Sequence, residues 1–250
     1  MNHSPVLQTH AITKRYGGLL VTDGVSLDLR QDELHAIIGP NGAGKTTLIN
    51  QLSGEAFPDS GQIHFGSADV SALPIHERSA LGLVRSYQIS SIFEELSVLE
   101  NIALAALGAS GRRLALFAPL LGDGSRVLAA HEAAGAVGLE HKLHVAAGDL
   151  AYGERRQLEL GMAVAAKPKC LLLDEPMAGM SIQESEKVVD LLMRLKRSIP
   201  ILLIEHDMHA VFRLADRISV LVYGKVIATG TPEEIKRNAE VRAVYLGQDS

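Results

Sequence analysis

The chain has 250 residues, of which 47% are hydrophobic and 21% charged, a usage that is typical of a globular protein with a buried core and excludes a disordered chain. It carries 24 Lys and Arg residues against 29 Asp and Glu residues, which gives a net charge of -5. This mildly acidic balance does not favour nucleic acid as a partner, because proteins bind nucleic acid through a basic face.

The single cysteine, Cys170, excludes an intramolecular disulfide and is typical of a reducing cytoplasm. It lies in the apolar run C-L-L-L, which predicts a buried thiol. The first residues, M-N-H-S-P-V-L-Q, lack the cationic and apolar regions of a signal peptide. The longest fully apolar stretch, at 114–121, is far shorter than the roughly 20 residues that span a bilayer. We therefore expect a protein that is not embedded in a membrane but could dock on one that is.

Residues 6–38 alternate apolar and polar side chains, and two turn signals interrupt them, G-G at 17–18 and D-G at 23–24. This pattern predicts short antiparallel strands. The apolar run at 34–38 predicts a strand that leads directly into a glycine-rich loop. Residues 45–53, with polar and apolar residues at helical spacing, predict the helix that follows the loop.

The region 89–165 is rich in alanine and leucine and predicts helices, the first of them opened by a capping box of Ser97 and Glu100. The run T-P-E-E at 231–234 predicts the start of a last helix. Strand signals with helical stretches between them return at 170–174, 200–206 and 218–222. This alternation predicts a parallel sheet with helices packed on it.

The run at 39–47 matches the phosphate-loop pattern G-x-x-x-x-G-K-[ST] and lies between a predicted strand and a predicted helix, as that loop requires. Its glycines let backbone N–H groups turn toward a polyphosphate, and the helix directs its positive dipole end at the same anion. We expect Lys45 to bridge the β- and γ-phosphates and the Thr46 hydroxyl to ligate Mg²⁺. The residues of the cradle are Gly39, Pro40, Asn41, Gly42, Ala43, Gly44, Lys45, Thr46 and Thr47.

The run C-L-L-L-D-E-P at 170–176 predicts an apolar strand that ends in two acids. Asp174 is placed to hold Mg²⁺ through water, and Glu175 to polarise the water that attacks the γ-phosphate. Alone, D-E-P could be a strand exit with solvated acids. His206 ends the run I-L-L-I-E-H and alone would be a structural residue, but the carboxyl ends of parallel strands gather around the ligand. We therefore expect His206 to lie beside Glu175 and the phosphates.

Five features of the sequence, taken in chain order, resemble the motifs of an ATP-binding-cassette (ABC) ATPase. They are the phosphate loop, Gln88, L-A-Y-G-E at 150–154, L-L-L-D-E-P and I-E-H-D. The resemblance covers essentially the whole chain. It implies an α/β fold with a RecA-like P-loop NTPase core, an N-terminal antiparallel β subdomain and an inserted α-helical subdomain. The implied divisions are 1–88 for the β subdomain and the first part of the core, 89–165 for the helical subdomain, and 166–250 for the second part of the core with the C-terminal helix.

The resemblance implies a Mg-dependent ATPase with ATP and Mg²⁺ as cofactors, and it assigns roles to three further residues. Tyr16 would stack on adenine. Gln88 would contact Mg²⁺ and sense the transmembrane partner, and His206 would contact the γ-phosphate. The implied catalytic set consists of Glu175, Gln88 and His206.

The run L-A-Y-G-E resembles the family's L-S-G-G-Q-type signature, which completes the ATP site of a second subunit. Gly153 and the helix N-terminus behind it would meet the γ-phosphate held by the partner's loop, together with Ala151, Tyr152 and Glu154. Backbone N–H groups and a helix dipole can do this without a reactive side chain. A simple amphipathic helix start is the alternative for this segment alone.

Two positions depart from the family pattern. Ala151 stands where a serine is usual, so one hydroxyl contact to the γ-phosphate is missing. Ser181 stands where an aspartate usually contacts the dimer partner, although Ser181 and Glu184 keep the spacing of a capping box. Neither change touches Lys45 or Glu175, so we expect hydrolysis to persist.

Four runs are similar to ATPase subunits of branched-chain amino-acid importers: R-Y-G-G-L, L-A-Y-G-E-R-R-Q-L-E-L, L-L-I-E-H-D-M and G-T-P-E-E-I-K…Y-L-G. Related importers carry urea, short amides or other small polar or aromatic compounds. The resemblance implies two transmembrane permease subunits, a second ABC ATPase chain in a homo- or heterodimer, and a periplasmic or extracellular solute-binding protein that acts indirectly. No nucleic acid partner is implied. The chain would lie peripherally on the cytoplasmic face of the inner or plasma membrane.

Two alternatives stay open at this point. One is the cassette ATPase of lipopolysaccharide export, which shares G-E-R-R and a similar phosphate loop. The other is a soluble, non-transport cassette that acts on nucleic acid or the ribosome. Proteins of that class typically carry two cassettes or long coiled-coil insertions, whereas this chain has one cassette and no heptads.

Overall fold

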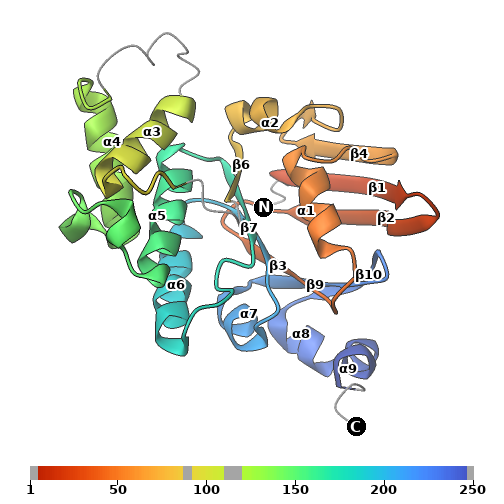
Figure 1. Ribbon diagram of the computed structural model, residues 1–250. Helices are drawn as coiled ribbons and strands as arrows, with labels where there is room; N and C mark the ends of the chain where they lie inside the picture. Colours follow the sequence, from red (N-terminus) through yellow and green to blue (C-terminus); the bar gives the residue numbers. More distant parts are fainter. Residues whose placement is uncertain (1–4, 87–91, 110–119, 247–250) are drawn as a thin grey trace.

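The structure, a computed structural model, describes residues 5–86, 92–109 and 120–246 (Figure 1). Its centre is a six-stranded sheet in the order β10-β9-β3-β8-β7-β6, parallel except for the β9-β10 pair. The strands are β3 (Leu34–Ile38), β6 (Leu83–Ser86), β7 (Cys170–Asp174), β8 (Ile201–Ile204), β9 (Arg217–Val222) and β10 (Lys225–Gly230). Every residue of β3, β7 and β8 is buried, as expected for short apolar strands covered on both faces. The predicted parallel sheet is confirmed.

The strand predicted at 200–206 is shorter than expected. The run at 200–206 was expected to carry His206 at its end, but β8 stops at Ile204. The Glu205 carboxylate accepts hydrogen bonds from the backbone N–H groups of Met177 and His206, at 3.1 Å each. These bonds tie the chain to a neighbouring loop instead of the ladder, so His206 lies two residues beyond the strand.

A second, antiparallel sheet has the order β2-β1-β4-β5 and contains β1 (Leu7–Tyr16), β2 (Leu19–Leu29), β4 (Ser60–Phe65) and β5 (Ala68–Asp69). The G-G turn at 17–18 joins β1 to β2 as predicted. The prediction of a turn at 23–24 is wrong, because both residues lie inside β2. Pairing with β1 continues on both sides, at Thr22 and at Val25, with a shift of register between them. Gly24, at φ +66°, absorbs this irregularity as a bulge rather than a reversal.

The helices lie on several sides of the two sheets in Figure 1. One group stands to the left of the parallel sheet and contains α3 (Val98–Ala109), α4 (Gly124–Ala136) and α5 (Tyr152–Ala165), with short 3-10 turns at Glu140–Lys142 and Ala147–Asp149. These helices occur where the sequence predicts them, and Ser97 and Glu100 form the predicted capping box. The other helices are α1 (Lys45–Ser53), α2 (Ile75–Leu81), α6 (Ile182–Leu195), α7 (Met208–Leu214), α8 (Pro232–Arg237) and α9 (Ala239–Leu246). Of these, α1 packs against β7, β6 and β2, between the two sheets.

The core consists of two layers, one on each face of the parallel sheet. Alternate residues of β7 show the division: Leu171 and Leu173 pack into the layer beneath the helical group, whereas Cys170 and Leu172 pack into the layer beneath α1. Cys170 is fully buried as predicted, and burial raises the pKa of its thiol. Because both faces are filled, the carboxyl ends of these strands are held in fixed positions.

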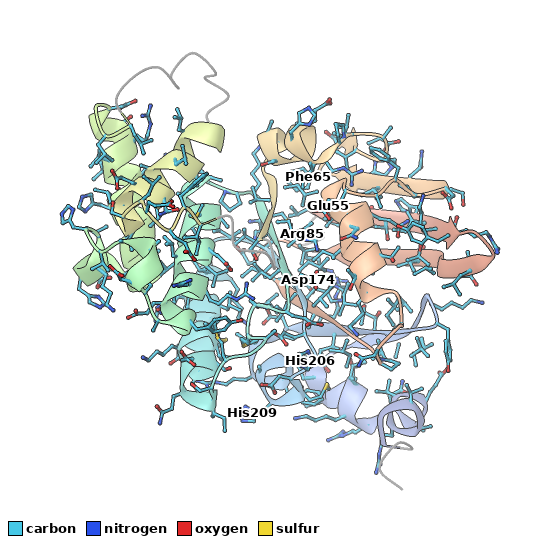
Figure 2. The ribbon with its side chains drawn as sticks, in the orientation of Figure 1. Glu55, Phe65, Arg85, Asp174, His206 and His209 are labelled. Atoms are coloured by element: carbon cyan, nitrogen blue, oxygen red, sulfur yellow. The ribbon has the colours of Figure 1, made fainter. Side chains whose placement is uncertain are left out.

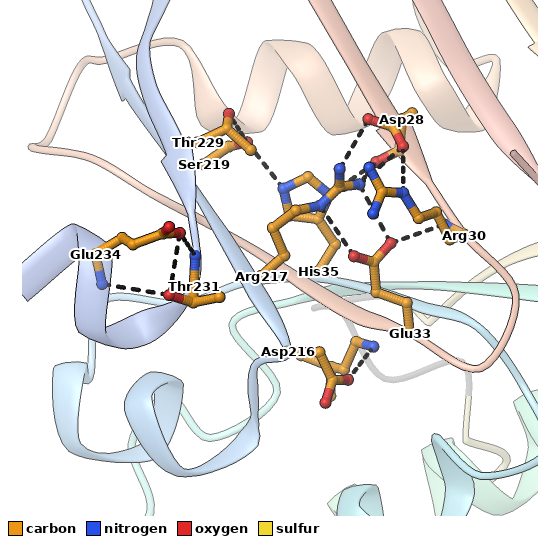
Figure 3. A network of polar contacts seen from close by, with 11 residues as sticks. Asp28, Arg30, Glu33, His35, Asp216, Arg217, Ser219, Thr229, Thr231 and Glu234 are labelled. Atoms are coloured by element: carbon orange, nitrogen blue, oxygen red, sulfur yellow. Dashed lines mark hydrogen bonds and ion pairs between the residues drawn. The ribbon is translucent and has the colours of Figure 1, made fainter. Parts of the chain in front are cut away.

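A buried polar network lies within the parallel sheet, where β3 and β9 meet the end of β2 (Figure 3). The His35 ring is fully buried, with Nδ1 2.8 Å from the Asp28 carbonyl oxygen and Nε2 2.8 Å from the Ser219 hydroxyl. Arg217 lies against the same ring at 3.3 Å and forms an ion pair with Glu33 at 2.9 Å. Burial, followed by the Arg217 charge, lowers the pKa of His35 from 6.5 to about 4.

This shift makes the free energy of unfolding depend on pH. Between pH 6.5 and about 4 the unfolded chain binds a proton at His35 that the folded chain does not, so stability falls as the pH is lowered from 7 to 4. The expected contribution is about 3 kcal/mol. We expect urea denaturation of the wild type and of His35→Gln to show a difference in unfolding free energy that shrinks by about this amount over that range. A difference that stays constant from pH 7 to pH 4 would contradict the assignment.

Candidate nucleotide-binding site

The phosphate loop connects β3 to α1 and is fixed by close contacts at its glycines. A Cβ atom on Gly39 would lie 2.1 Å from the Leu221 carbonyl oxygen, and one on Gly44 would lie 2.5 Å from the Val21 carbonyl oxygen. Gly44 also has φ +103°, a conformation that favours glycine. The loop is thus held between β2 and β9, and the first-turn N–H groups of α1, which have no intrahelical acceptor, are available to an anion there.

The turn between β9 and β10 supports the loop from one side. The Gly224 N–H donates to the Ala43 carbonyl at 2.9 Å, and the Asp23 N–H donates to the Gly224 carbonyl at 2.9 Å. A Cβ on Gly224, at φ +78°, would lie 2.5 Å from the Val21 carbonyl oxygen. The sequence analysis did not single out Gly224. Its only sequence signal is a glycine two residues after the strand predicted at 218–222.

Lys45 lies beneath the loop and is almost fully buried. Its Nζ donates to the carbonyl oxygens of Gly39 at 2.7 Å and Pro40 at 3.1 Å. Burial lowers the pKa of Lys45, and the nearby carboxylates of Glu175 and Asp174 partly offset that effect. The ammonium group therefore interacts electrostatically with the two predicted acids. The following residue, Thr46, is exposed at the start of α1.

The two acids lie at the carboxyl end of β7. Asp174 is the last residue of the strand and is buried; burial raises the pKa of its carboxyl, and Arg85 offsets part of the rise. Glu175 follows at φ +46°, a strained value for a residue other than glycine, and its N–H donates to the Ile204 carbonyl at 2.9 Å. Strain of this kind is found at functional sites when surrounding structure enforces it.

His206 Nδ1 lies 3.8 Å from Glu175 Oε1, and the His206 side chain is 61% exposed. The structure thus brings together four predicted site residues, Lys45, Asp174, Glu175 and His206, at the carboxyl ends of the parallel strands. Figure 2 labels two of them, Asp174 and His206. Gln88, the fifth predicted residue of this group, lies outside the described residues.

Tyr16 is the last residue of β1, and half of its surface is exposed. It pairs with Leu19 across the G-G turn, at the end of the hairpin from which Val21 contacts the phosphate loop. Lys14 Nζ lies 5.6 Å from the centre of its ring. The ring is accessible and on the same hairpin end as the loop contact, and its stacking on adenine stays a prediction.

Arg85, on β6, was missed by the sequence analysis (Figure 2). Its guanidinium forms an ion pair with Asp174 at 2.8 Å, with both side chains almost fully buried. It also donates to Asn50 Oδ1 at 2.7 Å and pairs with Glu55 at 2.9 Å. Arg85 therefore connects the end of α1 to the acid at the end of β7. An arginine in an otherwise apolar strand, L-V-R-S, was the available signal.

We expect Arg85→Ala to lower the free energy of unfolding by about 3 kcal/mol, because it leaves the buried Asp174 carboxylate without this partner. Arg213→Ala is the control: Arg213 pairs with Glu186 and Asp190 at a half-exposed surface and should cost less than about 1 kcal/mol. Chemical denaturation of both variants measures the difference. Equal losses would contradict a special role for the buried pair.

The predicted signature residues lie together at the start of α5. The Ala151 N–H donates to Glu154 Oε2 at 3.0 Å, and Glu154 pairs with Lys142 at 2.6 Å. The Tyr152 hydroxyl donates to the Ala178 carbonyl at 2.9 Å, and the Gly153 N–H donates to Glu184 at 3.2 Å. The structure therefore places Ala151, Tyr152, Gly153 and Glu154 around one helix N-terminus, beside the turn that follows Glu175.

The residues at the start of α5 and the phosphate loop lie in different parts of the structure. The helix after the loop, α1, packs against β7, β6 and β2, whereas α5 packs against α3, α4, α6 and β6. In Figure 1, α5 stands in the helical group and α1 beside the antiparallel sheet. The predicted site residues thus form two groups, one around Lys45 and Glu175 and the other around Gly153.

The chain is similar to known proteins over nearly its whole length. The sequence pattern described as ABC transporter matches residues 22–178, and that described as branched-chain amino acid ATP-binding cassette transporter matches residues 225–250. The chain is 38% identical to the high-affinity branched-chain amino acid transport ATP-binding protein LivG of Salmonella typhimurium, over 98% of each chain. It is 33% identical to the lipopolysaccharide export system ATP-binding protein LptB of Haemophilus influenzae, over 97% of this chain and 98% of LptB.

Among solved structures, an ATP-binding cassette of an ABC transporter in its ADP conformation superposes with a TM-score of 0.88 at 29% identity, over 98% of this chain and 99% of that one. The predicted fold class is therefore confirmed, with its P-loop core, antiparallel β sheet and inserted helices. Since the family pattern spans more than half of the chain and full-length relatives exceed 30% identity, the chain belongs to the ABC transporter family and is one of its ATP-hydrolysing cassettes.

Proposed function

We propose that this cassette powers an importer for branched-chain amino acids or a related small polar solute. The observation that carries the proposal is the similarity to LivG over the whole chain, together with the branched-chain pattern at residues 225–250. The lower identity to LptB makes lipopolysaccharide export the second candidate.

In this proposal ATP lies with its phosphates on the loop at 39–47. Lys45 would neutralise the β- and γ-phosphates, and Thr46, Asp174 and Gln88 would hold Mg²⁺ there. The close contacts at Gly39 and Gly44 support this assignment, because they hold the loop against β9 and β2 and so fix the backbone N–H groups that would bind the phosphates. Mg²⁺ would supply charge neutralisation on the phosphate oxygens.

Glu175 orients and polarises the attacking water, and His206 contacts the γ-phosphate from the segment that follows β8. The 3.8 Å separation of the two side chains supports this pairing, because the Glu175 carboxylate also interacts electrostatically with Lys45. The backbone of Glu175, held by its bond to Ile204, fixes the direction in which the carboxylate leaves the strand. A general base in a fixed position contributes about 10²–10⁴-fold to such a reaction.

Two chains together complete each ATP site in this proposal. One chain contributes its phosphate loop, which includes Lys45, and its partner contributes the N-terminus of α5, which includes Gly153. Tyr16 of the first chain stacks on adenine. The separation of the two groups of residues within one chain supports this division. Helix N-termini bind anions through N–H groups and the helix dipole, so the partner's contribution requires no reactive side chain.

The partners follow from the same proposal. They are two transmembrane permease subunits, a second ABC ATPase chain, identical or different, and a solute-binding protein that acts through the permease. Among the parts of the chain that the structure describes, no helix is long and apolar enough to cross a membrane. A peripheral position on the cytoplasmic face, contacting the permease through the region near Gln88 and the helical group, suits such a subunit.

The proposal is tested by purifying the tagged chain from its native membranes in mild detergent and identifying the copurified proteins by mass spectrometry. Two polytopic permease subunits of the amino-acid importer type, with or without a second cassette, are expected. A lipopolysaccharide-type permease would support the second candidate, and only soluble partners would contradict both.

A further inference from the structure

The N–H group of Gly153 already has an anionic partner within its own chain. Gly153 is the second residue of α5, where backbone N–H groups have no acceptor inside the helix. This N–H donates to Glu184 Oε1, at 3.2 Å. The acceptor comes from α6, which packs against α5. A carboxylate thus occupies the position that the proposed function gives to the γ-phosphate of the partner's ATP.

Glu184 is held in this position by its own helix cap. Its Oε2 accepts from the Ser181 hydroxyl at 2.7 Å and from the Ser181 N–H at 3.0 Å, while the Glu184 N–H donates back to the Ser181 hydroxyl at 3.3 Å. One oxygen is therefore engaged at the cap, and the other reaches Gly153. The bonds from Ser181, and then that from Gly153, lower the pKa of Glu184, so the carboxylate is charged at neutral pH.

The Glu184 side chain also covers the face of Gly153. A Cβ built on Gly153 would lie 2.8 Å from Glu184 Oε1 and 3.0 Å from Glu184 Cγ. The Tyr152 hydroxyl adds a second contact, to the Ala178 carbonyl at 2.9 Å. The start of α5 is therefore attached at two points to the segment that follows Glu175.

A phosphate and the Glu184 carboxylate cannot both occupy this place. Each would accept from the same N–H, and two like charges at such a separation repel each other. The partner's nucleotide can use Gly153 only in those molecules whose Glu184 has moved away, and its apparent affinity is reduced by that fraction.

We propose that Glu184 competes with the partner's γ-phosphate for the Gly153 N–H and so sets the ATP concentration at which two chains close on each other. The proposal rests on the two-chain ATP site described under the proposed function. It adds a residue that controls this site from outside the phosphate loop.

The test compares ATP-induced dimerisation of three chains that all carry Glu175→Gln to prevent hydrolysis: the parent, Glu184→Ala and Glu234→Ala. The last is a matched control, because Glu234 forms the same capping box with Thr231 at α8, with hydrogen bonds of 2.7–3.3 Å. Sedimentation velocity at increasing ATP with Mg²⁺ gives the midpoint of dimerisation. If the native complex contains a second cassette, that chain is added in equal amount.

We expect Glu184→Ala to lower the midpoint at least about threefold, as removal of a charge-assisted contact at a partly exposed position predicts. Glu184→Gln, which keeps an acceptor but no charge, should lie between it and the parent. Glu234→Ala should match the parent, and circular dichroism melts confirm that each variant is folded. A midpoint for Glu184→Ala equal to or above that of the control overturns the competition. Dimerisation of no variant, the parent included, refutes the two-chain site itself and is thus distinguishable from failure of the competition alone.

Discussion

Replacing Glu175 by glutamine is expected to lower the rate of ATP hydrolysis by about 10²–10³-fold while nucleotide binding persists. Glutamine has the same shape but cannot take up a proton, so the water would be oriented without being activated. The backbone at residue 175, at φ +46° and bonded to Ile204, does not depend on the charge of the side chain. The variant should therefore keep the geometry of the site.

Phosphate release by the purified protein measures the hydrolysis rate, and calorimetry with ATP and Mg²⁺ measures binding. Glu186→Gln serves as the control, since Glu186 is a half-exposed carboxylate on α6 that pairs with Arg213. It should retain the wild-type rate. Turnover of Glu175→Gln within a few-fold of the wild type would remove Glu175 from the role of general base.

Replacing Lys45 by alanine is expected to weaken ATP binding by about 10–100-fold, the range expected when a charged hydrogen bond is lost. Lys45 is buried beneath the loop and contacts its carbonyl groups, so its ammonium is already positioned where the phosphates would lie. Without it, the loop offers only backbone N–H groups and the helix dipole to a strongly charged ligand.

Calorimetric titration with ATP measures this loss directly. Lys225→Ala is the matched control, because Lys225 lies on the β10 strand near the supporting turn but is exposed and pairs with Asp23 at 3.0 Å. Its removal should change ATP affinity by less than about twofold. Equal affinities of the wild type and Lys45→Ala would count against the phosphate-cradle assignment.

The parallel sheet could be predicted from sequence because its strands are short apolar runs separated by helical stretches. β3 and β7 were found at their correct residues for this reason. The signals failed where contacts distant in sequence decide the conformation. A D-G pair at 23–24 is a common turn, but here pairing of β2 with β1 on both sides converts it into a bulge. The end of β8 depends on Glu205, whose bond to Met177 cannot be read from local sequence.

The same distinction applies to the site. Lys45, Asp174 and Glu175 lie in contiguous motifs, and the structure brings them together. Arg85 escaped prediction because its partner is 89 residues away and meets it only through the β6-β7 register, in which Arg85 lies opposite Leu172. Glu184 was recognised as half of a capping box, but nothing in its surroundings in the sequence connects it to Gly153.

Solute uptake by the native complex is the most direct test of the proposal that this chain powers an importer. The tagged chain is purified with its membrane partners, reconstituted into vesicles that contain ATP and Mg²⁺, and supplied with radiolabelled leucine and its solute-binding protein. We predict leucine accumulation with the wild-type chain and none above background with Glu175→Gln. Equal accumulation with the two chains, or ATP hydrolysis by the wild-type complex without uptake of leucine, isoleucine or valine, would contradict the proposal that this chain's hydrolysis powers a branched-chain amino-acid importer.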